Sequence, residues 1–362
     1  MEDVVSVGRE PDPYFWRGRR VLLTGHSGFK GAWAAFWLHE LGAEVHGLAL
    51  ASEGEPNLWD EIGAGLLGNE SFTDLREVGA VRAAVAEARP QIVVHMAAQA
   101  LVRRGYSDPV ETFAVNTLGT AHLLDALRGL AGLEAVLIVT SDKVYANDGG
   151  TRPFVETDRL GGNDPYSASK AASELIARSF GNSWFERGGV PLATARAGNV
   201  IGGGDWSEDR LVPDVWRACR SGTALRLRSP QATRPWQHVL EPLCGYFCYL
   251  EALATRANVP RALNFGPQHQ QPLTVQALAE TIAAGLGGGR EWAQDPGQHP
   301  PEAESLSLDS SLAEISLGWS ARLATSEAAD WTARWYRAFD EGLPARNLCL
   351  SQIRDYRTRI HA

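Results

Sequence analysis

The sequence has no excess of positive charge and no long uninterrupted apolar run. Its 34 lysines and arginines are outnumbered by 43 aspartates and glutamates, for a formal net charge of −9. Because nucleic-acid binding needs a basic surface, DNA and RNA are not expected as partners. No apolar stretch is long enough to span a bilayer, so no membrane association is expected either.

Cysteine is scarce, and the start of the chain lacks the pattern of a secretion signal. No zinc-type clusters are formed by the four cysteines, Cys219, Cys244, Cys248 and Cys349, so no metal site is expected. The first residues are mixed and acidic, without the basic start and apolar run of a signal peptide. These features predict buried, reduced thiols in a cytoplasmic protein.

The composition is that of an ordinary globular protein, with 44% hydrophobic and 21% charged residues. A disordered chain would have fewer apolar residues and more charge. At 362 residues the chain is longer than a typical single domain, so two lobes, or one large domain with an annex, are predicted.

Apolar strands and amphipathic helices alternate over the first half of the chain. Strands are expected at 21–23, 44–50, 91–96, 135–139 and 191–197, and helices after the turn at 24–31 and at 75–89, 110–130 and 166–188. Because these strands are apolar throughout, they are expected to be buried on both faces. The pattern predicts an α/β fold of the Rossmann type, with a doubly wound parallel sheet.

The turn after the first strand has the spacing of a dinucleotide-binding motif. Gly25, Gly28 and Gly31 form G-x-x-G-x-x-G between a strand and a helix, and Ser27 and Phe29 lie within the same turn. Glycines allow the close approach of a pyrophosphate, to which the helix N-terminus offers N–H groups and its positive dipole end. The alternative is a tight turn without a ligand, but the strand–helix context favours a cofactor.

The end of the second strand bears on the choice between NAD and NADP. The window from Gly47 to Glu53 has no aspartate at the strand tip and no arginine for a 2′-phosphate, which favours NAD. Asp74 and Leu75 follow a third strand near Ser71. Asp74 is expected either to accept a hydrogen bond from the adenine amino group or to cap the next helix.

The alternation loosens after about residue 200, where glycine- and proline-rich segments interrupt it. We therefore expect an NAD-binding Rossmann domain at 16–198 and a smaller, mainly substrate-binding lobe at 199–345, with the chain free to cross between them. Residues 1–15 and 346–362 are expected to be terminal extensions.

Tyr166 and Lys170 lie four residues apart in a predicted helix, and therefore on one face. A tyrosine pKa of about 10 is too high for a base at neutral pH. A lysine cation and a positive nicotinamide ring would favour the phenolate, which can then take a proton from an alcohol. Lys170 is also expected to bind the nicotinamide ribose. The strand that ends at Thr140 and Ser141 brings a hydroxyl to the carboxyl edge of the sheet, where ligands bind.

Several motifs occur in order and together resemble the extended short-chain dehydrogenase/reductase family of nucleotide-sugar enzymes. They are the glycine turn, Ala97-Ala98-Gln99, TSDK at 140–143 and Tyr166-x-x-x-Lys170. Longer pieces are most similar to the CDP-glucose 4,6-dehydratases: TGHSGFKG at 24–31, HMAAQALVR at 95–103, TSDKVY at 140–145, RAGNVIGGGDW at 196–206 and RPWQHVLEPLCGY at 234–246. The resemblance covers nearly the whole chain. It implies that Ala97, Ala98, Gln99 and Asn116 contact the cofactor.

The resemblance also implies the reaction of a nucleotide-sugar 4,6-dehydratase that uses NAD. CDP-glucose, the expected substrate, would be oxidised at carbon 4, lose water across carbons 5 and 6 and be reduced at carbon 6, giving CDP-4-keto-6-deoxyglucose. The alternatives are a 4,6-dehydratase of another nucleotide sugar, an NAD-dependent epimerase, and a catalytically silent NAD-binding regulatory protein. Intact Ser141, Tyr166 and Lys170 argue against the silent protein.

Asp142 and Lys143 distinguish dehydration from epimerisation, because only dehydration needs an acid and a base beside Ser141. Asp142 is expected to protonate the leaving carbon 6 hydroxyl. Lys143 stands where many related dehydratases have glutamate, and its ordinary pKa of about 10.4 makes it a poor base. Either a cationic neighbourhood lowers that pKa, or Lys143 stays charged and stabilises an enolate. The structural alternative for both residues is a surface ion pair.

A nucleoside diphosphate needs arginines, which bind phosphate oxygens bidentately. The resemblance favours Arg234 first and Arg210 second, and implies that Asn199 contacts the phosphate-linked part of the substrate. Arg103 or Arg104, after the Ala97-Ala98-Gln99 strand end, is expected to line the pocket.

Two further expectations concern histidines and assembly. His95 and His238 are expected to be structural hydrogen-bond partners, because Tyr166 fills the acid–base role. The apolar helices at 110–130 and 166–188 are expected to pair across a two-fold axis, as in relatives of this family, so a homodimer is predicted, with a tetramer as the alternative.

Overall fold

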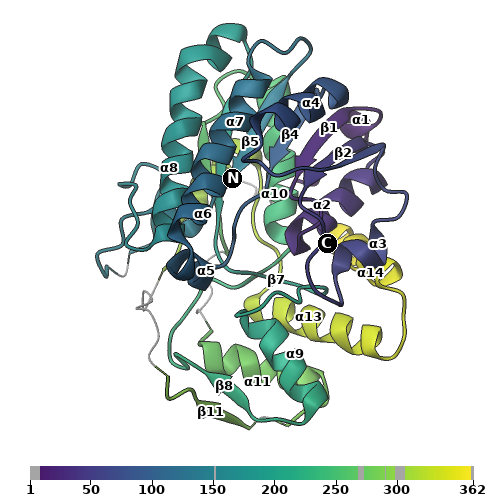
Figure 1. The fold of residues 1–362 in the computed structure, drawn as a ribbon. Coiled ribbons are helices and arrows are strands. Elements are labelled where there is room, and N and C mark those ends of the chain that lie inside the picture. The colour runs from purple at the N-terminus through teal and green to yellow at the C-terminus, as the bar shows by residue number, and fades with distance from the viewer. Residues whose placement is uncertain (1–8, 151, 268–272, 290, 298–305, 360–362) are drawn as a thin grey trace, which may run out of the picture.

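A seven-stranded sheet forms the centre of the molecule (Figure 1). The computed structural model describes residues 9–150, 152–267, 273–289, 291–297 and 306–359. The strand order is β10-β6-β5-β4-β1-β2-β3, and every pairing is parallel. The strands are β1 (Arg20–Thr24), β2 (Glu44–Ala49), β3 (Asn69–Phe72), β4 (Ile92–His95), β5 (Ala135–Val139), β6 (Leu192–Ala197) and β10 (Ala262–Phe265). The predicted α/β fold with a parallel sheet is confirmed.

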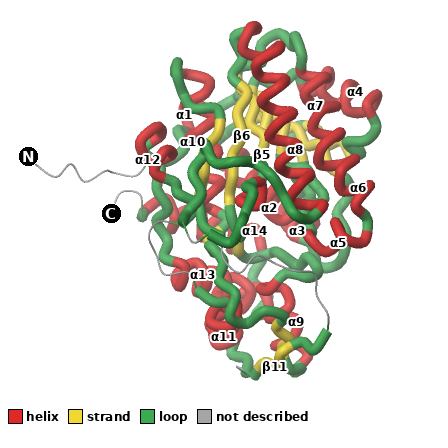
Figure 2. The backbone as a smooth tube through the Cα atoms, turned by 90° about the vertical axis from the view of Figure 1, so that its left-hand side faces the viewer, coloured by secondary structure: helices red, strands yellow, loops and turns green. Residues whose placement is uncertain are grey.

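Helices cover both faces of this sheet (Figure 2). One face carries α2 (Phe29–Glu40) and α10 (Leu240–Thr255), and the other carries α4 (Val78–Ala88), α7 (Gly119–Leu127) and α8 (Pro165–Phe180). Leu23 belongs to the core on the first face, whereas its neighbour Leu22 belongs to the core on the second. Since successive strand residues point to opposite faces, strands covered on both sides must be apolar throughout.

The strand order reverses between β1 and β4, which lie side by side although β2 and β3 separate them in the chain. Ligands of such sheets bind at the carboxyl ends of the strands at this reversal. The last residues of the two strands, Thr24 and His95, are paired, and the glycine turn and the Ala97-Ala98-Gln99 loop follow them directly. The topology therefore places the predicted cofactor motifs together.

A smaller group of elements lies below the sheet in Figure 1. It comprises α9 (Leu211–Ser221), α11 (Val275–Gly285), α13 (Thr325–Asp340) and the strand pairs β8 (Leu225–Leu227) with β11 (Trp292–Gln294) and β7 (Val200–Ile201) with β9 (Gln237–His238). Between these segments the chain returns to the sheet, because β10 pairs with β6 and α10 packs on β5. The chain thus crosses between the two parts within the range 199–345.

The remaining helices are short or terminal: α1 (Pro13–Trp16), α3 (Leu58–Ile62), α5 (Val102–Ser107), α6 (Pro109–Phe113), α12 (Ser311–Leu317), α14 (Ala345–Thr358) and the turns η1 (Ala114–Leu118), η2 (Asp142–Val144), η3 (Gly181–Phe185) and η4 (Glu186–Gly188). The predicted helix at 110–130 is three consecutive segments, α6, η1 and α7, of which η1 is a π-turn. A π-turn widens a helix by one residue without changing its apolar composition, so periodicity alone does not reveal it.

Helix α10 is enclosed on all sides, since every residue from Leu240 to Leu253 is buried. Its acidic side chains bond to segments from both ends of the described chain. Glu251 accepts hydrogen bonds from Arg9 Nη2 at 2.7 Å and Trp16 Nε1 at 2.8 Å, and Glu241 accepts one from the Tyr356 hydroxyl at 2.7 Å. Residues near both ends, expected to be terminal extensions, are therefore packed against the core.

All four cysteines are free thiols. Cys244 and Cys248, one turn apart on α10, are buried, as is Cys349, whereas Cys219 is partly exposed. The expected buried, reduced thiols are confirmed for three of the four. Among the residues described above, no helix combines the length and apolarity needed to cross a membrane, and no His, Cys, Asp and Glu side chains are grouped to hold a metal ion.

Candidate active site

The glycine turn packs tightly at two of its glycines and stays open at the third. Gly25 has a φ of +79°, and a Cβ there would lie 2.7 Å from the Ala97 nitrogen. A Cβ on Gly31 would lie 1.9 Å from the Gly25 carbonyl oxygen. Gly28 is exposed, and a Cβ on it would meet nothing nearer than 3.5 Å. Gly25 and Gly31 therefore serve the packing of the chain, while Gly28 leaves room for a ligand.

The open glycine is also the N-cap of α2, and no side chain caps this helix. Uncapped N–H groups and the positive end of the helix dipole suit a pyrophosphate. Ser27 ties the turn to β2 by donating its hydroxyl to the Leu50 carbonyl at 2.7 Å, and Phe29 is the first helical residue. These features fit NAD, whose diphosphate would be held by Gly28 and the first turn of α2.

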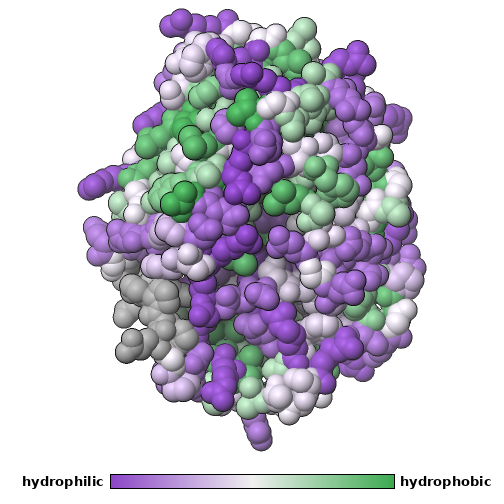
Figure 3. Space-filling model, viewed as in Figure 1, coloured by the Kyte–Doolittle hydropathy of each residue, from purple (hydrophilic) through white to green (hydrophobic). Residues whose placement is uncertain are grey.

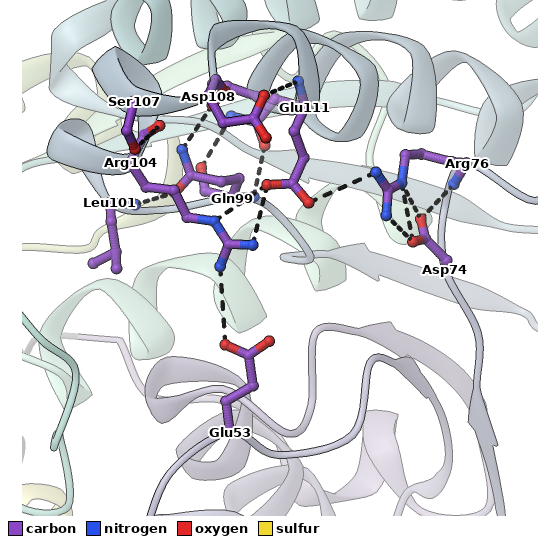
Figure 4. A network of polar contacts seen from close by, with 11 residues as sticks. Glu53, Asp74, Arg76, Gln99, Leu101, Arg104, Ser107, Asp108 and Glu111 are labelled. Carbon is purple, nitrogen blue, oxygen red and sulfur yellow. Dashed lines mark hydrogen bonds and ion pairs between the residues drawn. The ribbon is translucent and has the colours of Figure 1, made fainter.

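Asp74 lies in a polar network after β3 (Figure 4). Its Oδ1 accepts from the Arg76 N–H at 2.8 Å, and its carboxylate pairs with the Arg76 guanidinium at 2.6 Å. This hydrogen bonding lowers the pKa of Asp74. The N-cap of α4 is Glu77, so the capping alternative for Asp74 is wrong. The neighbouring Leu75 is buried and its carbonyl accepts from His122 Nδ1 at 2.8 Å.

Asn116, in the π-turn η1, braces the loop that follows β4. Its Oδ1 accepts from the Gln99 N–H at 2.8 Å, and its Nδ2 donates to the Gln99 carbonyl at 3.0 Å and to Ser169 Oγ at 2.9 Å. Ala97, on the other side of Ala98, donates its N–H to Thr24 Oγ1 at 3.0 Å. One amide thus connects the Ala97-Ala98-Gln99 loop to α8.

Helix α8 carries Tyr166 and Lys170, which are only 8% and 7% exposed. The Lys170 ammonium donates to the Val139 carbonyl, at the end of β5, at 3.3 Å. Burial lowers the pKa of Lys170 to about 8, and the nearby carboxylate of Glu174 opposes that effect. The predicted pair therefore lies at the carboxyl edge of the sheet, beside the strand that leads to Ser141.

The pKa of Tyr166 responds to several neighbours. The pKa of Tyr166 is raised, chiefly by burial and also by the charge of Asp142, whereas the cation of Lys143, a hydrogen bond with Ser141 and the cation of Arg210 oppose the rise. The sequence predicted that Lys170 favours the phenolate. The cations that oppose the rise in the structure are Lys143 and Arg210, which come from η2 and from the segment before α9.

Asp142 and Lys143 form turn η2 directly after β5, with Ser141 as its N-cap. Ser141 Oγ donates to Asp142 Oδ1 at 3.0 Å and accepts from the Lys143 N–H at 3.2 Å. The Lys143 ammonium lies 3.7 Å from the same oxygen, and the Asp142 side chain is 2% exposed. The two residues do form an ion pair at the strand end, in which Asp142 is buried and the Lys143 side chain is 30% exposed.

Asp142 Oδ2 and Asn199 Oδ1 are buried oxygens at this edge that lack a hydrogen-bond partner among the described residues. A Cβ on Gly198 would lie 3.2 Å from Asp142 Oδ2 and 2.8 Å from Pro235, so the segments around Asn199 and Arg234 meet at this carboxylate. Buried polar atoms are rarely left unsatisfied, so this place fits a polar ligand.

The structure separates the predicted arginines. Arg210 is bonded to Asp205 at 2.9 Å, and Arg103 to Asp209 at 2.7 Å, which places both guanidinium groups on one segment. Arg234 is buried and donates to the Thr233 carbonyl at 2.8 Å.

Arg104 lies elsewhere, in the network of Figure 4. It lies 3.0 Å from Glu111 and 3.9 Å from Glu53, and Glu111 in turn pairs with Arg76 at 3.6 Å. These carboxylates hold Arg104 on the side of Asp74, so the structure does not bring it together with Asn199 and Arg210.

Both histidines expected to be structural are buried. His95 is within hydrogen-bond distance of Thr24 Oγ1, at 2.7 Å, and of Thr120 Oγ1, at 3.0 Å. Burial lowers the pKa of His95, and that of His238, to about 3. Both side chains are therefore neutral at physiological pH, in keeping with a structural role.

Sequence reasoning missed Lys30, which lies within the quoted TGHSGFKG motif. Its ammonium is 5.9 Å from the ring centroid of Tyr246. Burial, followed by the cations of Arg210 and Lys170, lowers the pKa of Lys30 to about 7, and Asp142 opposes the shift. A signal was available, because a cation in the first turn of a helix opposes the helix dipole.

Comparisons with known proteins agree with this geometry. Residues 21–266 match the model of the NAD dependent epimerase/dehydratase family. The chain is 41% identical to a CDP-glucose 4,6-dehydratase of Salmonella typhimurium over 95% of its own length and 98% of the relative's. The structure is similar to an epimerase from Methanothermobacter thermautotrophicus, with a TM-score of 0.80, 22% identity, and coverage of 91% of this chain and 95% of that one.

A second solved structure is a dTDP-glucose 4,6-dehydratase from Streptomyces venezuelae with NAD bound, with a TM-score of 0.75 and 25% identity, covering 88% of this chain and 97% of that one. The family match spans more than half of the chain, and it includes the glycine turn, Ser141 and the Tyr166–Lys170 pair. The chain therefore belongs to the NAD dependent epimerase/dehydratase family.

Proposed function

We propose that this chain is a nucleotide-sugar 4,6-dehydratase that converts CDP-glucose to CDP-4-keto-6-deoxyglucose and water. The identity of 41% with a CDP-glucose 4,6-dehydratase, over nearly the full length of both chains, supports the substrate. The observation that carries the reaction type is Asp142, a buried carboxylate with one unpartnered oxygen beside Ser141. An epimerase needs no acid at this place.

Two groups of residues next to Ser141 are proposed to carry out the proton transfers, one for the oxidation and one for the elimination. NAD, when bound, accepts a hydride from carbon 4 and donates one at carbon 6. Tyr166, hydrogen-bonded with Ser141, takes the proton of the carbon 4 hydroxyl, and Lys170 positions the nicotinamide ribose. The cations of Lys143 and Arg210 partly offset the rise that burial causes in the pKa of Tyr166.

The elimination is assigned to Asp142 and Lys143, the two residues that follow Ser141 in the chain. Asp142 donates the proton to the departing carbon 6 hydroxyl. Lys143, whose ammonium is 3.7 Å from Asp142 Oδ1, is proposed to act at carbon 5, either as the base or as a cation that stabilises the enolate.

The proposed binding residues follow the same geometry. Gly25, Ser27, Gly28, Phe29 and Gly31 would hold the cofactor, together with Asp74, Leu75, Ala97, Ala98, Gln99 and Asn116. Asn199, Arg210, Arg234 and Arg103 would receive the substrate diphosphate. Arg104 is better placed to support the Asp74 side of the cofactor site, because Glu111 links it to Arg76.

A panel of nucleotide sugars tests the proposal. The purified protein, supplied with NAD, would be incubated separately with CDP-glucose, UDP-glucose, dTDP-glucose and GDP-mannose, and Tyr166→Phe would serve as the blank. The expected result is a 6-deoxy-4-keto product from CDP-glucose without net formation of reduced cofactor. A 4-epimer instead of a 6-deoxy product would support the epimerase alternative, and a 6-deoxy product from another sugar alone would correct the substrate.

A homodimer is proposed through the helices at 109–127 and 165–180. Val110, Phe113, Leu118 and Leu175 are large apolar residues that remain exposed on these helices. In Figure 3 hydrophobic patches lie on the left of the face shown, over α6 and α8. Contiguous exposed apolar surface of this kind is typical of protein interfaces. A cytoplasmic location is also proposed, because all four thiols are free.

A further inference from the structure

Glu174 is a buried carboxylate that the proposed reaction does not use. It is 4% exposed and lies one helical turn after Lys170 in α8. Its Oε1 accepts from Thr140 Oγ1 at 2.5 Å and Arg196 Nε at 2.9 Å. Its Oε2 accepts from Thr194 Oγ1 and Arg196 Nη2, both at 2.8 Å. Burying a carboxylate is costly, and here four hydrogen bonds and the Arg196 guanidinium offset that cost. The question is what this buried, paired carboxylate does for the protein.

The arginine partner extends the network beyond the sheet. Arg196 Nη1 donates to the Tyr145 hydroxyl at 2.8 Å, and that hydroxyl donates to Asn264 Oδ1 at 2.7 Å. Tyr145 follows η2 directly, and Asn264 lies in β10. The network therefore joins α8 to three neighbouring strands and to the turn that carries Asp142 and Lys143.

Glu174 lies next to both Ser141 and Lys170, which are proposed to take part in the oxidation of carbon 4. Thr140, its closest partner, immediately precedes Ser141. Lys170 lies on the same face of α8, four residues before Glu174, because residues i and i+4 are neighbours on a helix. The hydrogen bonds that Glu174 accepts come from Thr140, Thr194 and Arg196, so it borders the residues that are proposed to bind the cofactor and the substrate.

We propose that Glu174 is a positioning residue of the redox pair, which fixes α8 against the strand end at Thr140–Ser141 and supplies the counter-charge of the Lys170 ammonium. This inference rests on the proposed function, since it assigns Glu174 a part in the oxidation of carbon 4. It acts through Lys170 and Ser141 and is therefore not itself a catalytic residue.

The electrostatic part of the proposal depends on every charged group that faces Lys170 or Glu174. Burial lowers the pKa of Lys170 to about 8, and Glu174 is the group that raises it. The other facing groups are Lys30 from α2, His95 from β4, Arg196 from β6 and Tyr249 from α10. Burial lowers the pKa of His95 to about 3 and raises that of Tyr249, so both are neutral near pH 7. The cation of Lys30 repels the Lys170 ammonium, whereas the carboxylate of Glu174 stabilises that ammonium.

The sign of the expected pH effect follows from this balance. Lys170 must be charged to act as proposed, and it loses its charge as the pH rises through a pKa of about 8. Replacing Glu174 with glutamine removes the counter-charge and lowers that pKa further. The basic limb of the pH profile for carbon 4 oxidation should therefore move to lower pH, by about one unit.

The experiment measures single-turnover oxidation of CDP-glucose from pH 6 to pH 9 in the parent and in Glu174→Gln. Loss of the Lys170 charge is expected to slow the variant by about two-fold at neutral pH and by about ten-fold at pH 9, with the basic limb displaced. Thr194→Val is the matched control, because it removes one hydrogen bond to Glu174 without changing any charge. Glu174→Asp keeps the charge and should restore the parental limb. The proposal is overturned if the limb of Glu174→Gln moves no further than that of Thr194→Val.

A second measurement keeps this inference separate from the proposed function. The pH dependence of NADH binding, followed by fluorescence, reports on Lys170 without any sugar substrate, and its basic limb should move in the same direction in Glu174→Gln. If the parent oxidises no nucleotide sugar, the proposed function fails, and the NADH profile alone decides the role of Glu174. If Glu174→Gln does not fold because Arg196 is left unpaired, the double variant Glu174→Gln/Arg196→Met removes both charges and is measured instead.

Discussion

At the scale of single residues, the two oxygens of the Asp142 carboxylate have different surroundings. Oδ1 accepts from Ser141 and lies 3.7 Å from the Lys143 ammonium, whereas Oδ2 is buried without a partner among the described residues. The bonded oxygen fixes the side chain, and the unbonded one is available to a polar group of the substrate. This asymmetry is what a positioned proton donor needs.

Asp142→Asn keeps the size of the side chain but removes the acid. Because Ser141, Tyr166 and Lys170 stay in place, carbon 4 should still be oxidised, while loss of the carbon 6 hydroxyl slows by about 10²–10⁴-fold. Stopped-flow absorbance should show reduced cofactor accumulating before any 6-deoxy product. The matched control is Asp148→Asn, on the exposed loop after η2, which should behave as the parent. Product formation at the parental rate in Asp142→Asn would refute the acid role.

Tyr166→Phe removes the proposed proton acceptor and keeps the ring. We expect carbon 4 oxidation to fall by about 10²–10⁴-fold, with unchanged melting temperature and NADH affinity. Quenched-flow product analysis, thermal unfolding and a fluorescence titration would measure these three quantities. Tyr14→Phe, at a position that is 83% exposed, is the control. Near-normal oxidation in Tyr166→Phe would show that another group takes the proton.

At the scale of elements, two glycines at the junction of β1 and α2 have different roles: Gly31 allows close packing, and Gly28 leaves open space. A Cβ on Gly31 would lie 1.9 Å from the Gly25 carbonyl oxygen, so Gly31→Ala must push the helix away from the turn. Overpacking of this kind costs about 1–3 kcal/mol or more, and a lower melting temperature is expected. Gly28→Ala meets no such clash, and its φ of −81° suits alanine.

Gly28→Ala is therefore the matched partner of Gly31→Ala. It should keep the parental melting temperature but weaken NADH binding, because its methyl group occupies the space left for the diphosphate. Differential scanning calorimetry and a fluorescence titration separate the two effects. Equal loss of stability in both variants would contradict this division of roles.

Much of the sheet could be predicted from the sequence, because strands buried on both faces are apolar throughout and glycine turns separate them from helices. The proposed redox pair of Tyr166 and Lys170 could also be placed on one helix face, since four residues separate the two side chains. Glu174 and Lys30 were not assigned roles, because their partners are distant in the chain. Glu174 in α8 bonds Arg196 in β6, and Lys30 in α2 is close enough to Arg210, before α9, for that cation to lower its pKa; only tertiary packing brings these residues together.

The structure also separates Arg103 from Arg104, which the sequence offered as alternatives for lining the substrate pocket. Arg103 and Arg104 are adjacent in sequence, but successive residues of a helix point in directions about a quarter-turn apart. Arg103 reaches Asp209, whereas Arg104 reaches Glu111 and Glu53. Sequence alone does not show which of two neighbouring side chains faces the substrate.

At the scale of the whole molecule, the exposed apolar residues of α6, η1 and α8 predict the assembly. Leu175→Glu places a charge on this surface and should convert the proposed dimer to a monomer, because a buried, unpaired charge is strongly unfavourable. Light scattering at micromolar concentration measures the mass. Ile315→Glu is the control, since Ile315 is 82% exposed on α12, away from these helices. A parent that is already monomeric, or a dimer that survives Leu175→Glu, would reject the interface.

The enclosure of α10 has a consequence for how the protein is made. Glu241 accepts from the backbone of Arg322 at 2.8 Å and of Leu323 at 2.6 Å, and its other oxygen accepts from Tyr356. These partners emerge from the ribosome some 80 to 115 positions after Glu241 itself. Until they arrive, α10 lacks part of its cover, although every strand of the central sheet has already been synthesised. The packing around α10 is therefore completed only after the C-terminal residues have been synthesised. A chain truncated before α14 would contain every strand of the central sheet but would leave part of α10 uncovered.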